Sequence, residues 1–179
     1  MTDLQVVAFL LAAAFAAAGV AAAGAPARVR EWARRFPRDK WCGRVLTTVD
    51  LVWVAWLLFR APLGRFESLK PALYLLTPVA IVLVACFLDE LLAPRALGGA
   101  LLLAPDPMLQ AAQWHESSLR FLVSGPAYVL VVLGMALLLS PHLFRKAAGL
   151  LKTDGAWRAA GAVCILLALG WLVLGVAAY

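Results

Sequence analysis

LQVVAFLLAAAFAAAGVAAAG, residues 4–24, is an uncharged and almost wholly apolar stretch near the start of the chain. It is long enough to cross a membrane as a helix, which takes about 20 mostly apolar residues. Four later stretches have the same character, although Asp50 interrupts the first of them: residues 45–59, 71–88, 121–139 and 159–178. Because these runs are continuous rather than alternating, they predict helices and not the strands of a membrane barrel. The sequence therefore predicts an all-α, polytopic transmembrane helical bundle.

The composition favours a single integral membrane domain over residues 1–179. Hydrophobic residues make up 64% of the chain and charged residues only 15%, whereas a soluble domain carries roughly 25% charged residues. The net charge of +6 comes from residues that flank the apolar runs, and no aromatic-interleaved basic groove typical of nucleic-acid binding occurs. The lipid bilayer is therefore an expected partner, and nucleic acid is not.

Metal and cofactor sites are not predicted. Cys42, Cys86 and Cys164 lie far apart in the chain, without a CxxC pair or a cluster of His and Cys. His115 and His142 lie outside the apolar runs, which disfavours a haem held between transmembrane histidines. We expect no disulfide framework, metal or cofactor.

The basic stretch at residues 26–44 predicts the orientation of the chain. It holds seven Lys and Arg residues against two acidic ones, and an excess of Lys and Arg marks the cytoplasmic side. The chain starts with an acidic rather than a basic segment, so we expect a retained first helix and not a cleaved signal peptide. The N-terminus is then outside, and residues 26–44 form a cytoplasmic loop.

Residues 91–118 are ambiguous between a re-entrant segment, an interfacial segment and a broken crossing. Their apolar part, residues 96–104, would extend only about 13 Å as a helix. Gly98 and Gly99 are expected to loosen its start, and Pro105-Asp106-Pro107 is expected to break its end. We predict five spans plus this short segment, with six spans as the alternative.

Charge counting favours six spans over five. Five spans place nine Lys and Arg residues inside and seven outside, whereas six spans place twelve inside and four outside. The counts differ because the four basic residues at 145–158 move inside while Arg120 moves outside. Against six spans, Asp106 near the bilayer centre would cost about 2.5–3.5 kcal/mol, and hydrophobic length decides for five.

An internal repeat is a further interpretation of residues 4–60 and 119–178. A shift of 115 residues places Gly19 on Gly134 and Asp39 on Asp154. Chance alignment of two hairpins of similar composition is the alternative. Five spans would make the copies inverted, and six would make them parallel, and both arrangements are found in transporters.

The C-terminal hairpin, residues 128–175, carries a family resemblance. Two apolar runs flank a polar pattern of Gly134, Ser140-Pro141, Arg145, Asp154, Arg158 and Gly161. This pattern resembles the small two-span YjeT-like family of bacterial inner-membrane proteins and covers about a quarter of the chain. The resemblance implies a bacterial inner membrane and no particular activity.

Asp50 is the principal candidate for a functional residue. It lies inside an apolar run beside Thr47 and Thr48, and an acid within the membrane is costly and is by default a functional hypothesis. It would serve as a proton relay, a cation ligand or the partner of an Arg from another helix. The alternative is that Asp50 sits at the cytoplasmic interface, bonded to a Thr or to Arg44.

Asp89, Glu90 and Arg95 complete the candidate intramembrane polar site. They follow the third apolar run directly, and the alternative to a polar cavity mouth is a solvated helix end. His115-Glu116 lacks the second His that a zinc-binding HExxH motif needs, because position 119 is Leu. No catalytic residue is predicted, and an enzyme using Asp89, Glu90, His115 and Glu116 on a lipid-like substrate is the weakest hypothesis.

Two function classes remain for a chain of this kind. The first is a non-enzymatic scaffold, assembly factor or accessory subunit that binds other membrane proteins or copies of itself. The second is a small transporter or channel that uses Asp50 for proton or cation coupling. Co-purification of a partner would favour the first class, and a homo-oligomer would keep the second open.

Overall fold

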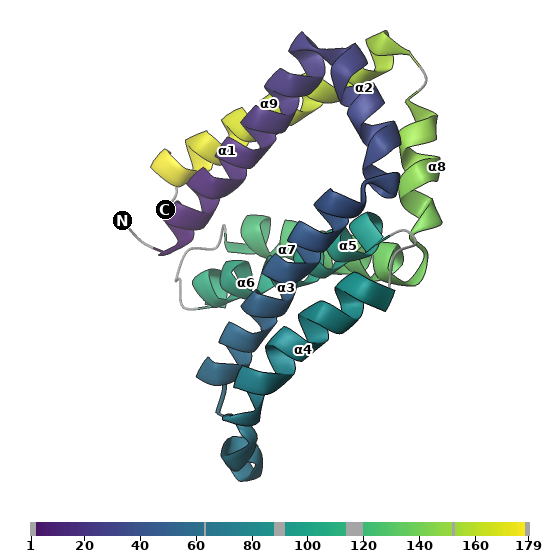
Figure 1. Cartoon of the computed structure of the whole chain (residues 1–179). Helices are drawn as coiled ribbons and strands as arrows, with labels where there is room; N and C mark the ends of the chain where they lie inside the picture. Colours follow the sequence, from purple (N-terminus) through teal and green to yellow (C-terminus); the bar gives the residue numbers. More distant parts are fainter. Residues whose placement is uncertain (1–2, 63, 88–91, 114–119, 152, 178–179) are drawn as a thin grey trace. The chain divides into compact units, whose positions relative to one another are not determined.

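The computed structural model describes residues 3–62, 64–87, 92–113, 120–151 and 153–177 (Figure 1). These residues form helices and short turns, and no strand occurs among them, so the all-α prediction is confirmed. The longer helices are α1 (Asp3–Gly24), α3 (Lys40–Arg60), α4 (Ala72–Phe87), α7 (Arg120–Leu139) and α9 (Asp154–Ala177). The shorter ones are α2 (Pro26–Arg35), α5 (Leu92–Leu103), α6 (Pro105–Gln113), α8 (His142–Leu150) and the 3-10 turns η1 (Phe36–Arg38) and η2 (Gly64–Leu69).

Four helices, α1, α3, α7 and α9, are long and apolar enough to cross a membrane. The helix α4 is apolar but shorter, with a qualifying stretch at Ala72–Val84. The long helices leave large apolar side chains exposed, such as Leu10 at 66% and Leu166 at 68%. Such faces suit hydrocarbon as the surrounding solvent, and the helices are those of a membrane protein.

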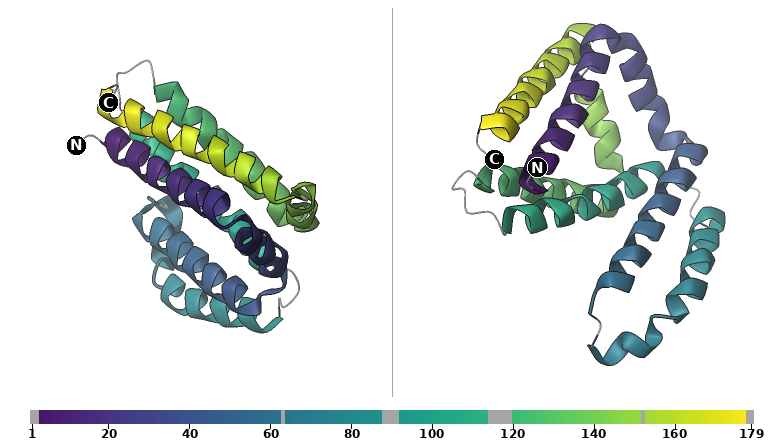
Figure 2. Two further views of the ribbon diagram at one scale, coloured as in Figure 1. Left: turned by 90° about the horizontal axis from the view of Figure 1, so that it is seen from above. Right: turned by 90° about the vertical axis from the view of Figure 1, so that its left-hand side faces the viewer.

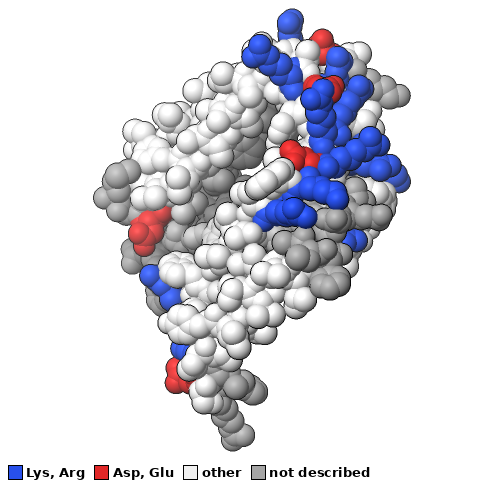
Figure 3. Space-filling view, viewed as in Figure 1, with Lys and Arg blue, Asp and Glu red and all other residues white. Residues whose placement is uncertain are grey.

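Residues 26–44, predicted to be the cytoplasmic connection between two spans, are mostly helical. Pro26 occupies the first position of α2, where proline is favoured because its missing N–H would be unpaired anyway. Asp39 then caps α3, accepting hydrogen bonds from the backbone N–H groups of Trp41 and Cys42 at 3.0 and 3.2 Å. Figure 3 shows Lys and Arg side chains gathered where α2 lies. The basic segment is therefore mostly helical.

The chain divides into two compact units, the first of which holds Met1–Arg35, Ala104–Val132 and Arg145–Tyr179. Within it, α1 and α9 lie side by side along their lengths (Figure 2). Gly19 lies against Gly161, and Ala8 lies against Gly175, so the two helices run antiparallel. A Cβ atom added to Gly161 would lie 2.8 Å from the carbonyl oxygen of Gly19. Small residues thus permit the close contact.

One end of the first unit holds its hydrophobic core. The start of α1, the helix α6, the first half of α7 and the end of α9 meet there. The buried members are Leu4, Ala8, Ala12, Met108, Ala112, Val123, Ala127 and Trp171. The first residues of α1 and of α7 therefore lie at the same end of the unit.

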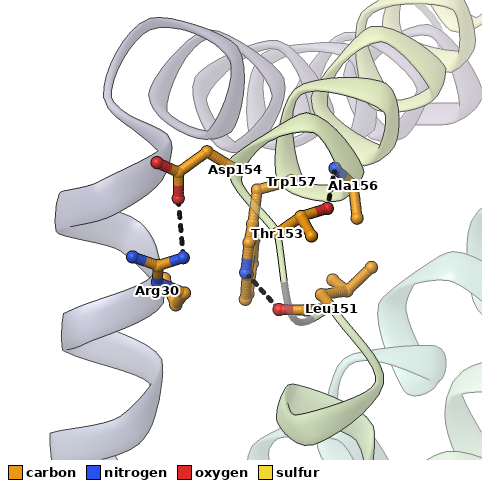
Figure 4. Close-up of polar contacts among 6 residues, drawn as sticks. All are labelled: Arg30, Leu151, Thr153, Asp154, Ala156 and Trp157. Carbon is orange, nitrogen blue, oxygen red and sulfur yellow. Dashed lines mark hydrogen bonds and ion pairs between the residues drawn. The ribbon is translucent and has the colours of Figure 1, made fainter.

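Polar contacts join the other end of the first unit (Figure 4). The Arg30 guanidinium on α2 pairs with the Asp154 carboxylate at the start of α9, with 2.8 Å between Nη1 and Oδ1. The indole N–H of Trp157 donates to the carbonyl oxygen of Leu151 at 3.0 Å. The Thr153 hydroxyl oxygen accepts from the backbone N–H of the first turn of α9 at 3.2 Å. The helix after α1 is thereby fixed to the start of α9.

The second unit holds Phe36–Leu103 and Leu133–Phe144. In it, α3 and α4 form an antiparallel pair, since Phe59 near the end of α3 lies against Tyr74 near the start of α4. Their ring centroids are 4.7 Å apart. This hairpin agrees with two successive crossings joined by the short turn that contains η2.

The helix α5 packs between α3 and the last part of α7. Gly43 on α3 lies against Leu92, near the start of α5, and Asp50 lies further along against Gly99, so α3 and α5 are parallel. The opposite direction applies to α7, because Gly98 lies against Leu138 while the later Leu102 lies against the earlier Gly134. In the second unit, α3 and α5 thus run in one direction, and α4 and the last part of α7 run in the other.

The ambiguous stretch is helical on both sides of Ala104. Gly98 and Gly99 lie inside α5 and do not loosen it, because both face neighbouring helices at close range. The break predicted at Pro105-Asp106-Pro107 is shifted, since α5 ends at Leu103 and α6 begins at Pro105 itself. Pro at a helix start costs no hydrogen bond, which explains why α6 can begin there.

The helix boundaries of the two proposed repeat copies correspond at the 115-residue shift. Moved by this shift, α1 ends at position 139, where α7 ends, and α2 covers positions 141–150, where α8 covers His142–Leu150. The helix α3 would start at position 155, and α9 starts at Asp154. The repeat stays a prediction, with this correspondence in its favour.

Candidate functional site

Asp50 lies on the buried face of α3 and faces another helix. The residue is only 8% exposed, although it stands in the middle of an apolar helix. Its carboxylate points at α5, where a Cβ atom added to Gly99 would lie 2.9 Å from Oδ2. The absence of a side chain at Gly99 therefore makes the room that the carboxylate occupies. This position matches what is expected of an acid inside a span, because a charge facing lipid would be too costly.

A pocket of about 380 Å³ surrounds this carboxylate within the second unit. Thr47, one helical turn before Asp50, and Arg95, one turn before Gly99, also line it. The remaining lining residues are apolar: Leu51, Val54, Val84, Leu92, Ala96, Gly99, Leu102, Leu103 and Leu138. The pocket therefore presents one acid, one hydroxyl and one cation on an otherwise apolar wall.

Two polar oxygen atoms in this pocket lack a hydrogen-bond partner among the described residues. They are Oδ1 of Asp50 and Oγ1 of Thr47. An unpaired polar group away from water costs several kcal/mol, and more if it is charged. Arg95 lines the same pocket, yet no ion pair joins it to Asp50 in the described part of the chain. The Asp50 carboxylate is thus able to accept a proton, a cation or a hydrogen bond from a group that is not among the described residues.

The predicted site is only partly assembled by the structure. Thr47, Asp50 and Arg95 line the same pocket. Thr48 does not, because its hydroxyl donates to the carbonyl oxygen of Arg44 at 2.8 Å and its side chain lines a shallow groove on another face of α3. A β-hydroxyl often bonds back to the preceding helical turn, which explains the difference.

Several predicted residues lie outside the part of the chain that the structure describes. Asp89 and Glu90 fall in the gap between α4 and α5, and His115 and Glu116 fall in the gap between α6 and α7. Among the described residues, no group of three or more His, Cys, Asp or Glu side chains is arranged to hold a metal ion. The candidate site is therefore Asp50, Thr47 and Arg95.

The glycines of α5 are the functional feature that sequence reasoning missed. Gly98 allows α7 to approach, and Gly99 leaves space for the Asp50 carboxylate. The available signal was the spacing of Gly99 four residues after Arg95, which places both on one helical face. The pair was instead interpreted only as a source of helix instability.

The electrostatics at the start of α3 differ from those at Asp50. The Cys42 thiol donates to Oδ2 of Asp39 at 3.2 Å. This hydrogen bond, together with the backbone N–H groups of Cys42 and Trp41, lowers the pKa of the Asp39 carboxyl below its ordinary value. Asp39 is therefore a charged helix cap at neutral pH, where a negative charge also suits the helix dipole.

No protein-family model, curated protein sequence or solved structure matches the chain. The likeness of residues 128–175 to the YjeT-like hairpin therefore stays a prediction from their sequence. Function is inferred below from the residues and their contacts.

Proposed function

We propose that the chain is a six-pass protein of a bacterial inner membrane that serves as a scaffold, assembly factor or accessory subunit of a larger membrane complex. Its crossings are α1, α3, α4, the α5–α6 stretch, α7 and α9. The N- and C-termini are outside, and residues 26–44 and 140–153 are cytoplasmic. The YjeT-like pattern of the C-terminal hairpin supports the bacterial inner membrane as the location.

An even number of spans is supported by the first unit alone. The Arg30–Asp154 ion pair and the antiparallel packing of α1 on α9 bring the end of α1 and the start of α9 to one side of the membrane. Five spans would put three crossings between these two points and so separate them by the whole bilayer. This contact therefore supports the six-span alternative over five spans.

The sixth crossing is supported by helix directions in the second unit. The helix α5 runs parallel to α3 and antiparallel to the last part of α7, as an additional crossing between α4 and α7 requires. From Leu92 to Gln113 the stretch has 22 residues with one interruption at Ala104, which is enough for a crossing. Six spans also leave twelve of the 16 Lys and Arg residues inside, in agreement with the charge rule.

Reporter fusions test this topology. A fusion after Lys152 should be cytoplasmic, and a fusion after Gln113 should be external. An external reporter after Lys152 would restore an odd number of spans and would contradict six. A cytoplasmic result at both positions would mean that the α5–α6 stretch does not cross.

The role in a complex is carried by one observation, the buried Asp50 carboxylate whose Oδ1 has no hydrogen-bond partner among the described residues. Acids inside membranes face a protein or a wet cavity and are paired there. A basic or polar side chain from another subunit would supply the missing partner, and the open pocket lined by Thr47 and Arg95 gives it access. Asp50 would then act as a specific attachment point for a neighbouring transmembrane helix.

Co-purification in mild detergent tests this role. The wild-type chain should retain a partner in fixed stoichiometry, whereas the Asp50→Leu variant should lose it. Thr47→Val, inside the pocket, should weaken the association, and the matched Thr48→Val, on another face of α3, should not. Equal retention by all variants, or no partner with the wild type, would refute the proposal.

Proton or cation coupling is the second candidate function. The specific observation in its favour is the combination of an acid, a hydroxyl and a cation around one pocket of about 380 Å³. In liposomes that contain the purified chain alone, Asp50→Asn should abolish any ion flux above that of empty liposomes. Wild-type liposomes without such flux would remove this candidate and leave the complex subunit.

A further inference from the structure

An apolar groove of about 560 Å³ lies in the first unit, where α1 ends and α9 begins. It is separate from the Asp50 pocket, and its size is in the range of about 300–1,000 Å³ that small ligands occupy. The lining residues come from α1, α2, the turn between them and α9: Ala18, Ala21, Ala22, Ala25, Arg28, Val29, Trp32, Trp157, Ala160 and Cys164. Five of these residues are alanines, so the groove is hollow because the facing side chains are short.

Two tryptophans and one arginine line this groove beside its alanines. Trp32 and Trp157 line it together with Arg28, and Trp157 is held by its hydrogen bond to the carbonyl oxygen of Leu151. Tryptophan is enriched at the level of the lipid headgroups. The groove thus combines an alanine wall with side chains that are common at the level of the lipid headgroups.

The positive charge of Arg28 is available to a ligand in this groove. Glu31 is paired with Arg35 at 2.6 Å, and Asp154 is paired with Arg30 at 2.8 Å. Among the described residues no ion pair involves Arg28, and Arg28 is exposed. An anion with an attached apolar chain complements both the charge and the walls.

We propose that this groove binds an anionic phospholipid, with its phosphate on Arg28 and one acyl chain along the alanine wall between α1 and α9. The proposal rests on the cytoplasmic placement of residues 26–44 proposed above, and it is independent of the role of Asp50. Basic pockets at the cytoplasmic side between transmembrane helices recognise anionic headgroups, and that leaflet presents them. The lipid would seal the space that the short alanine side chains leave between the two helices.

Native mass spectrometry of the purified full-length protein provides the test. Phosphatidylglycerol and phosphatidylcholine with identical acyl chains are added in turn, and the fraction of protein that carries one bound lipid is measured. The wild type should retain phosphatidylglycerol in preference to phosphatidylcholine. Arg28→Gln should reduce that preference about fivefold, as expected for one basic contact, and Arg34→Gln, on the same helix outside the groove, should leave it.

A second pair, of one variant and its control, tests the site of the acyl chain. Ala18→Leu fills the groove wall and should lower retention of phosphatidylglycerol, whereas Ala17→Leu, on the same helix outside the groove, should not. Circular dichroism and gel filtration establish that each variant is folded, and Arg28→Lys should keep the preference. Equal retention of both lipids, or equal effects of a variant and its control, would overturn the proposal. Asp50→Leu should leave lipid retention unchanged, which separates this result from that of the partner experiment.

Discussion

Substitution of Gly161 by alanine should separate α1 from α9. The added Cβ atom would lie 2.7 Å from the backbone nitrogen of Ala23 and 2.8 Å from the carbonyl oxygen of Gly19. Ordinary contacts of a Cβ atom lie at 3.4–4 Å, so the backbones must move apart by several tenths of an ångström. Both contacts are with backbone atoms, and no rotamer change of a flexible side chain relieves them.

The magnitude follows from a comparison with Gly170 on the same helix. A Cβ atom added to Gly170 meets nothing within 4 Å, so Gly170→Ala gains only helix propensity, up to about 1 kcal/mol. Gly161→Ala gains the same propensity but adds an overpacking cost of about 1–3 kcal/mol. The free energy of unfolding of Gly161→Ala should therefore lie about 1–3 kcal/mol below that of Gly170→Ala.

Unfolding in mixed micelles with a rising fraction of a denaturing detergent measures this difference. The signal is tryptophan fluorescence, since Trp171 lies in the core of the same unit. Because Gly19 and Gly161 form one contact, Gly19→Ala should also destabilise, and the double variant should fall short of the sum. Equal midpoints for Gly161→Ala and Gly170→Ala would refute the close packing of α1 on α9.

Three further outcomes are expected. Asp50→Leu should keep or raise the free energy of unfolding of the isolated chain, by up to about 4 kcal/mol, because an unpaired buried carboxylate is replaced by an apolar side chain of similar volume; a loss in thermal unfolding would contradict the unpaired state. Hydrogen bonds lower the pKa of the Asp39 carboxyl. The charged carboxylate should therefore stabilise α3 as its N-terminal cap above the ordinary Asp pKa of about 3.9, and this stabilisation should be lost as the pH falls through the lowered value. Asp39→Asn should abolish this loss of helix in acid, as measured by circular dichroism. A variant with Arg30→Cys and Asp154→Cys, free of other cysteines, should be cross-linked within one chain by a short thiol reagent, and no product would refute the contact.

The sequence predicted the long helices because hydrophobic length alone determines them. The apolar runs at residues 4–24 and 121–139 reappear as α1 and α7 with boundaries shifted by about one residue. The prediction failed where tertiary contact overrides local preference. Gly98 and Gly99 disfavour a helix in isolation, but in α5 they allow close packing against α7 and the carboxylate of Asp50.

The candidate site was predictable in its residue types more than in its geometry. An acid in an apolar run is conspicuous, and Asp50 was accordingly the first choice. Whether Thr48 faces the pocket depends on where α5 packs against α3, and the spacing of residues 45–59 does not reveal this. Hydropathy likewise left the span count undecided, and the Arg30–Asp154 ion pair only supports the even number proposed above.

The pairing of the first helix with the last has a consequence for biosynthesis. Residues 36–103 of the second unit are contiguous and can pack while the ribosome is still translating. By contrast, α1 must remain in the bilayer without its partner until α9 has been made, because Gly19 meets Gly161 across almost the whole chain length. Contacts of such long sequence separation form late. A chain truncated before Asp154 would therefore leave the alanine-rich face of α1 open to chaperones and proteases, and membrane quality control would recognise incomplete synthesis at its N-terminal helix.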